Sequence, residues 1–182
     1  MLTALGILSC AFYAIHAGFH WSRGAPQDML WVCHLAALLV GVGLIFRLPA
    51  LNAMGVLILM VGCPLWLLSL LGGAELLPTS LLTHVGGLVI GLIGVKYLGL
   101  SKGAWWRAGI VVAALMGVSL LLSRESNVNV SHAPYSGWEV MYPWAGLYQV
   151  QLWLQWCLGL FAAEIVLRRV VSPSSPPQNR DG

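Results

Sequence analysis

Residues 51–71 read LNAMGVLILMVGCPLWLLSLL, a continuous run that contains no charged side chain. A helix that crosses a lipid bilayer needs roughly 20 consecutive, mostly apolar residues. Because this run reaches that length, it predicts a membrane-spanning helix. The composition of the rest of the chain agrees, since 59% of its residues are hydrophobic, only 8% are charged and the mean hydropathy is +0.83. Soluble domains are about 45–50% apolar and about 25% charged.

Other apolar runs precede and follow this one, each bounded by glycine, proline or charged residues that are typical of helix ends and turns. They cover residues 2–18, 29–46, 79–98, 105–122 and 144–167. The sequence therefore predicts an all-α, polytopic membrane protein with six transmembrane helices. Residues 1–171 would form one transmembrane domain, and no stretch remains for a soluble domain. The Ser/Pro-rich tail, residues 172–182, is predicted to be disordered.

The basic residues predict the orientation. Six crossings place both termini and the second and fourth connections on one side, which then carries seven of the 9 Lys and Arg residues: Arg47, Lys96, Lys102, Arg107, Arg168, Arg169 and Arg180. The other side carries Arg23 and Arg124. Cytoplasmic segments are enriched in Lys and Arg, so both termini and the tail are predicted to be cytoplasmic, in the plasma membrane. The net charge of +3 then reflects topology and not nucleic-acid binding, and membrane lipids are the expected partners.

All five histidines fall on the predicted outer side. His16 and His20 lie in the last turns of the first helix, and His132 lies in the long outer loop, residues 124–143. His34 and His84 each lie five residues after a predicted helix start, about 7–8 Å deep at 1.5 Å per residue. Polar residues below the membrane surface usually face the bundle interior and mark functional sites. We therefore expect His34 and His84 inside the bundle, and His20 and His132 at its rim.

The histidines suit the binding of either a metal ion or a haem. His16 and His20 are spaced i,i+4 and so share one face of a helix, which suits the binding of a divalent metal. Histidines from different helices could also ligate a haem. A subunit that packs into a larger membrane complex without catalysing a reaction is a third alternative.

A catalytic role is the remaining alternative, with Cys33 as a candidate nucleophile. Cys33 lies at the outer end of the second helix, next to His34, but adjacent residues on a helix point about 100° apart, so a base must come from another helix. His84, at the same predicted depth, could activate the thiol. We expect an outer cavity lined by Cys33, His34, His84, His16 and Gln151, and covered by the loop 124–143.

Two packing features are also predicted. Gly87 and Gly91 are separated by three residues and give the fourth apolar run a small-residue face, which predicts close packing and a central position. Glu164 and Arg168 are spaced i,i+4 near the end of the last run, which predicts an ion pair.

Short motifs in the first four apolar runs resemble those of the YwaF-like integral membrane proteins. They are the Cys33-His34 dipeptide, Gly55 followed by Pro64 in the third run, and His84 after Leu77-Pro78-Thr79-Ser80. That family resembles the autophagy-associated transmembrane acyltransferase and the androgen-induced hydrolases of fatty acid esters. The similarity covers most of the chain.

The resemblance implies acyl chemistry on lipids without a cofactor, with Cys33 as nucleophile and His84 as general base. The androgen-induced hydrolases use a threonine on the second helix, and this chain has none there. This difference favours a thioester route for a lipid acyl hydrolase or acyltransferase.

Overall fold

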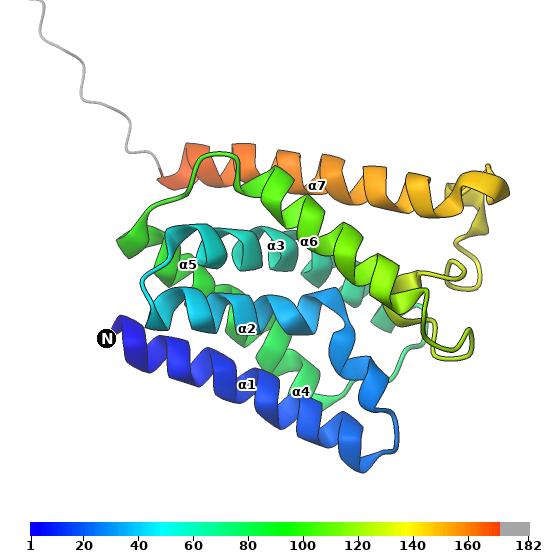
Figure 1. Ribbon diagram of the computed structural model, residues 1–182, viewed down its shortest axis with the longest axis horizontal. Helices are drawn as coiled ribbons and strands as arrows, with labels where there is room; N and C mark the ends of the chain where they lie inside the picture. Colours follow the sequence, from blue (N-terminus) through cyan, green and yellow to red (C-terminus); the bar gives the residue numbers. More distant parts are fainter. Residues whose placement is uncertain (172–182) are drawn as a thin grey trace, which may run out of the picture.

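The computed structural model describes residues 1–171, and every regular element in that part of the chain is helical (Figure 1). The tail predicted to be disordered lies outside the described residues. The α-helices are α1 (Leu2–Ser22), α2 (Val32–Ile45), α3 (Pro49–Leu71), α4 (Pro78–Leu81), α5 (Gly87–Leu98), α6 (Ala104–Ser119) and α7 (Tyr148–Val171). Short 3-10 turns are η1 (Pro26–Leu30), η3 (Val128–Val130), η4 (Glu139–Met141) and η5 (Ala145–Leu147), and η2 (Leu82–Gly86) is a π-helical turn between α4 and α5.

Each of the six predicted apolar runs forms a helix, but the helices differ in length. Four are long and apolar enough to cross a membrane: α1, α3, the continuous segment Pro78–Leu98, and α7. They indicate a multi-pass membrane protein. Helices α2 and α6 have 14 and 16 residues, fewer than the roughly 20 that a crossing requires. The predicted count of six crossings therefore stays a prediction.

Directions alternate along the series α1, α2, α3, α5, α6 and α7, so the N-terminus and the end of α7 lie at the same end of the bundle (Figure 1). Helix α3 packs against α2, α5, α6 and α7, and its residues Leu57, Ile58 and Leu59 are fully buried. The central helix is thus α3 and not the glycine-rich fourth run. Helix α5 packs against α1, α2 and α3.

Glycines let these helices approach closely, as predicted for the fourth run. A Cβ atom added at Gly91 would lie 2.5 Å from Val56 Cγ2 and 3.0 Å from Val40 Cγ2. A Cβ atom at Gly55 in α3 would lie 2.7 Å from the carbonyl oxygen of Ala36 in α2. Backbone atoms cannot rotate away, so Gly55 determines how closely α2 and α3 pack.

The Gly55→Ala variant is expected to lower the free energy of unfolding by about 1–3 kcal/mol, the typical cost of overpacking. Gly117→Ala in α6 is the matched control, because a Cβ atom there would have no neighbour within 4 Å. Removing a helical glycine at an open position should stabilise by about 0.5–1 kcal/mol. Thermal unfolding in detergent measures both changes, and equal effects at the two positions would contradict this account of the α2–α3 contact.

The predicted pair of Glu164 and Arg168 is confirmed, with Arg168 Nη2 donating to Glu164 Oε1 at 2.6 Å. Glu164 is buried, and its other oxygen accepts a hydrogen bond from the Trp105 backbone N–H at 2.7 Å, in the first turn of α6. The Arg168 side chain also donates to the Ser101 carbonyl. This network fixes the end of α7 to the start of α6.

Helix α2 begins later than the sequence predicted. A 3-10 turn that starts at Pro26 occupies the first part of the predicted run, and α2 starts only at Val32. His34 therefore lies in the first turn of α2 and not five residues inside the helix. Proline fixes its own backbone angle but donates no hydrogen bond, which suits the start of a short turn.

Candidate functional site

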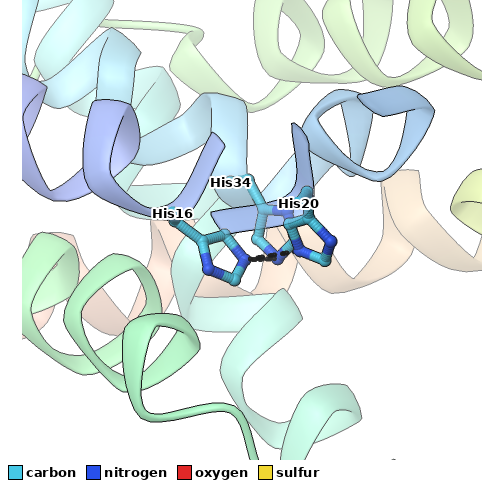
Figure 2. A group of neighbouring side chains, drawn as sticks. All are labelled: His16, His20 and His34. Atoms are coloured by element: carbon cyan, nitrogen blue, oxygen red, sulfur yellow. Dashed lines mark hydrogen bonds between the residues drawn. The ribbon is translucent and has the colours of Figure 1, made fainter. Parts of the chain in front are cut away.

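Three histidine rings meet where α1 ends and α2 begins (Figure 2). That end of the bundle lies opposite the termini (Figure 1). His16 and His20 come from the last two turns of α1, and His34 comes from the first turn of α2. The Nε2 atom of His16 lies 3.0 Å from Nε2 of His34 and 3.2 Å from Nε2 of His20. All three residues are buried, and His16 is only 1% exposed. The rim position expected for His20 is therefore wrong.

The other nitrogen of each ring has its own partner. His34 Nδ1 lies 3.0 Å from the Asp28 carbonyl oxygen, His16 Nδ1 lies 2.7 Å from Thr79 Oγ1, and His20 Nδ1 lies 3.6 Å from the Asp28 carboxylate. A carbonyl only accepts hydrogen bonds, so His34 Nδ1 carries the proton. The Nε2 atom of a neutral His34 ring then presents a lone pair to the centre of the group. For His20, the Asp28 carboxylate is an ion-pair neighbour of Nδ1 at 3.6 Å and not a hydrogen-bond partner.

This geometry matches a set of metal ligands. Zinc binds imidazole nitrogen at about 2.0–2.1 Å, so two ligand nitrogens of a tetrahedral site lie about 3.3 Å apart. The two short distances at His16 are close to that value, and the ligand atoms of all three histidines lie within 4.8 Å of one another. Histidine ligands usually donate their second ring N–H to a carboxylate, a carbonyl or water. His34 Nδ1 has such a partner in the Asp28 carbonyl, and the Asp28 carboxylate lies near His20 Nδ1. His16 Nδ1 differs, because its partner is the hydroxyl of Thr79.

A short segment of chain supplies the whole group. The α1–α2 turn closes through a hydrogen bond from the Ala25 N–H to the His20 carbonyl, and η1 then places both the carboxylate and the carbonyl of Asp28 beside the rings. Burial raises the pKa of the Asp28 carboxyl, and the neighbouring His20 ring opposes that rise. The sequence predicted the i,i+4 pair of α1. It did not predict that the tight turn would bring His34 to the same point.

His84 lies beside this group but differs in its contacts. Its ring stacks on Trp66, with the centroids 4.6 Å apart, and its centroid lies 5.5 Å from that of His34. His84 Nδ1 donates to the Ser80 carbonyl at 2.8 Å, which leaves a lone pair on Nε2. His84 belongs to the π-helical turn η2, and such turns occur frequently at functional sites.

A cavity of about 360 Å³ adjoins the histidines, and its wall includes Cys33, His34, His84, His16 and His20. Gln151, which was expected in this wall, does not line the cavity, and both polar atoms of its buried amide lack a partner within the described chain. The outer loop contributes Tyr135 and Trp138. Burial raises the pKa of Tyr135 to about 12, so its phenol keeps its proton near neutral pH.

Cys33 lines the cavity, but its thiol packs against a neighbouring helix. Its Sγ atom packs against Gly62, where a Cβ atom would collide with the sulfur. Among residues 1–171 the structure has no hydrogen bond between Cys33 Sγ and a histidine ring, whereas Cys63 Sγ donates to the His84 carbonyl at 3.5 Å. The pairing of Cys33 with His84 as nucleophile and base stays a prediction. So does the acyl chemistry that the resemblance implies.

Asn129 is a positioning residue that the sequence analysis did not identify. Its Oδ1 accepts a hydrogen bond from the Val32 N–H at 2.7 Å, and its Nδ2 donates to the Leu30 carbonyl at 3.0 Å and to Ser119 Oγ at 2.9 Å. These bonds attach the outer loop to the start of α2, two residues before His34. A left-handed backbone, φ 57°, aims the side chain there, and asparagine tolerates that conformation.

Comparisons of the chain with protein-family models, with curated proteins and with solved structures give no match. The fold and the site alone therefore define the class. It is a helical protein with membrane-length helices and a buried group of three histidines at one end of the bundle. The resemblance to the YwaF-like proteins stays a prediction.

Proposed function

We propose that this chain is an integral membrane protein that binds one divalent transition metal ion through Nε2 of His16, His20 and His34. The observation that carries the proposal is the convergence of the three Nε2 atoms around His16. Imidazole nitrogen suits zinc, copper, iron and nickel. The spacing of the nitrogens favours a small tetrahedral ion such as zinc, with the cavity on the side of the fourth ligand.

The same distances favour an ion over a haem. A haem held between two histidines needs its macrocycle to pass between the rings. Two Nε2 atoms 3.0 Å apart leave no space for it, and the third ring lies only 3.2 Å away. A single ion needs only the space between the three nitrogens.

We further propose that the histidine group lies on the outer side of the plasma membrane. Arg47 follows α2, and Lys102 lies between α5 and α6. Lys96 lies in the last turn of α5 and Arg107 in the first turn of α6, so all four are at the same end of the bundle as the termini. Arg23 lies at the histidine end. This distribution supports cytoplasmic termini, because basic residues concentrate on the cytoplasmic side of membrane proteins.

Metal analysis tests the proposal. The protein is purified in detergent without chelator, loaded with zinc and desalted, and its metal content is measured by inductively coupled plasma mass spectrometry. We expect one zinc ion per chain. Metal content no higher than that of the desalting buffer would contradict the proposal.

Thr79→Val should weaken zinc binding by about 10–100-fold, as is typical when a ligand loses its hydrogen-bond partner. The change removes the hydroxyl 2.7 Å from His16 Nδ1 and conserves the side-chain shape. Competition with a fluorescent zinc chelator gives the affinity. The matched control is Thr3→Val, in the first turn of the same helix as His16, at the opposite end of the bundle. An equal effect of both substitutions would show that the Thr79 hydroxyl does not orient His16.

A further inference from the structure

We propose that the cavity beside the histidines binds a long-chain carboxylate, that is, a fatty acid, with its carboxylate on the metal ion. The inference rests on the proposed metal site and adds the ligand class. It is carried by three features of the described residues: the apolar wall of the cavity, the charge around the histidines, and the opening near Glu75.

The wall of the cavity is suited to a hydrocarbon chain. Away from the histidines it is formed largely by Leu65, Leu70, Leu77, Trp66, Trp156 and Tyr142. Small-molecule sites have volumes of roughly 300–1,000 Å³ and combine apolar walls with a few convergent polar groups. The cavity, at about 360 Å³, lies within that range, and its polar lining residues include four histidines together with Asp28, Ser69, Glu75, Ser80 and Asn129.

The charge balance favours an anionic head group. Three neutral imidazoles leave a bound divalent ion with both of its positive charges. The Asp28 carboxylate, beside His20, offsets one of them. A buried charge is costly unless it is paired, so an anion at the fourth position is favoured. A carboxylate supplies both the balancing negative charge and an oxygen atom that can bind the metal ion.

The cavity has a polar opening through which a head group could enter. Glu75 lines the cavity, and its side chain is 67% exposed, so the cavity reaches the surface there. Arg23 pairs with Glu75 at 3.1 Å, so the negative charge of this carboxylate at the opening is balanced. Tyr135 and Trp138 of the outer loop cover another part of the wall. An amphipathic molecule with one acidic end matches this arrangement.

Native mass spectrometry in detergent tests the inference, because one spectrum reports bound zinc and bound lipid separately. We expect zinc-loaded protein to bind one palmitate, and methyl palmitate, which lacks the charged head, to bind at least about tenfold more weakly. Leu65→Trp, which fills the cavity, should also reduce palmitate binding by at least about tenfold. Leu67→Trp is the matched control, since Leu67 is exposed on the same helix and does not line the cavity.

Zinc-loaded protein without palmitate, or equal binding of palmitate and its methyl ester, would overturn this inference and leave the metal site intact. Palmitate binding that is unchanged in Leu65→Trp would also overturn it, because the lipid would lie outside the cavity. If zinc itself is missing from the spectrum, the proposed function fails and this inference fails with it. The comparison with the methyl ester uses the wild-type protein, so it remains decisive if Leu65→Trp does not fold.

Discussion

Zinc binding is expected to be lost in the His16→Ala variant, with an affinity decrease greater than the roughly 10–100-fold that follows loss of a ligand's hydrogen-bond partner. His16 is the central ligand, because its Nε2 atom is within 3.2 Å of both other Nε2 atoms. Removing it leaves two imidazole ligands, His20 and His34, in place of three. Zinc stoichiometry and chelator competition measure the effect.

His132→Ala is the control for this experiment. It removes one histidine from the same end of the bundle, but His132 lies in the outer loop and does not line the cavity. We expect it to bind zinc with wild-type affinity. If the two alanine variants lose zinc to the same extent, binding is not specific to the three-histidine group.

Asn129→Ala is expected to have the largest effect on stability, lowering the free energy of unfolding by about 3 kcal/mol. The substitution leaves the Val32 N–H and the Leu30 carbonyl without their partner, and each unpaired buried polar group costs about 1–3 kcal/mol. Ser119 Oγ also loses a contact but still donates to the Leu115 carbonyl. Alanine in the left-handed conformation of this position adds about 1 kcal/mol. Thermal unfolding in detergent measures the loss, and zinc affinity should fall because the start of α2 positions His34.

Asn127→Ala is a close control, since Asn127 lies in the same loop and has φ 41°. Its side chain accepts hydrogen bonds from the backbone N–H groups of His132 and Ala133, but Asn127 is more exposed, so water can replace part of what is lost. We expect a loss of about 1 kcal/mol, with zinc affinity unchanged. Equal losses of stability and of zinc affinity at the two positions would contradict the role assigned to Asn129.

The sequence predicted the helical content well because apolar periodicity and length are local properties. All six apolar runs form helices, and the Glu164–Arg168 pair needed only i,i+4 spacing. Helix boundaries were less predictable. The start of α2 depends on the 3-10 turn after Pro26, and the central position of α3 depends on contacts with four other helices. Neither feature follows from the apolar pattern of a single run.

The site was predictable in part. The i,i+4 spacing indicated that His16 and His20 share a face, and the pattern of termini and turns placed His34 at the same end of the bundle. The sequence did not predict which side chains contact each histidine ring. Equal depth placed His34 and His84 together inside the bundle, and their ring centroids lie 5.5 Å apart, but the ring nitrogens of His34 contact Asp28 and His16. Side-chain direction is set by the turn between α1 and α2, and the sequence pattern carried no signal for it.

The most direct test of the metal site is the X-ray absorption spectrum of the zinc-loaded protein at the zinc edge. The account predicts a four-coordinate ion with three imidazole nitrogens at about 2.0–2.1 Å and one further light ligand. In His34→Ala the same measurement should show fewer imidazole scatterers or no specifically bound zinc. A sulfur ligand at about 2.3 Å, or a coordination shell of oxygen alone, would contradict the three-histidine site.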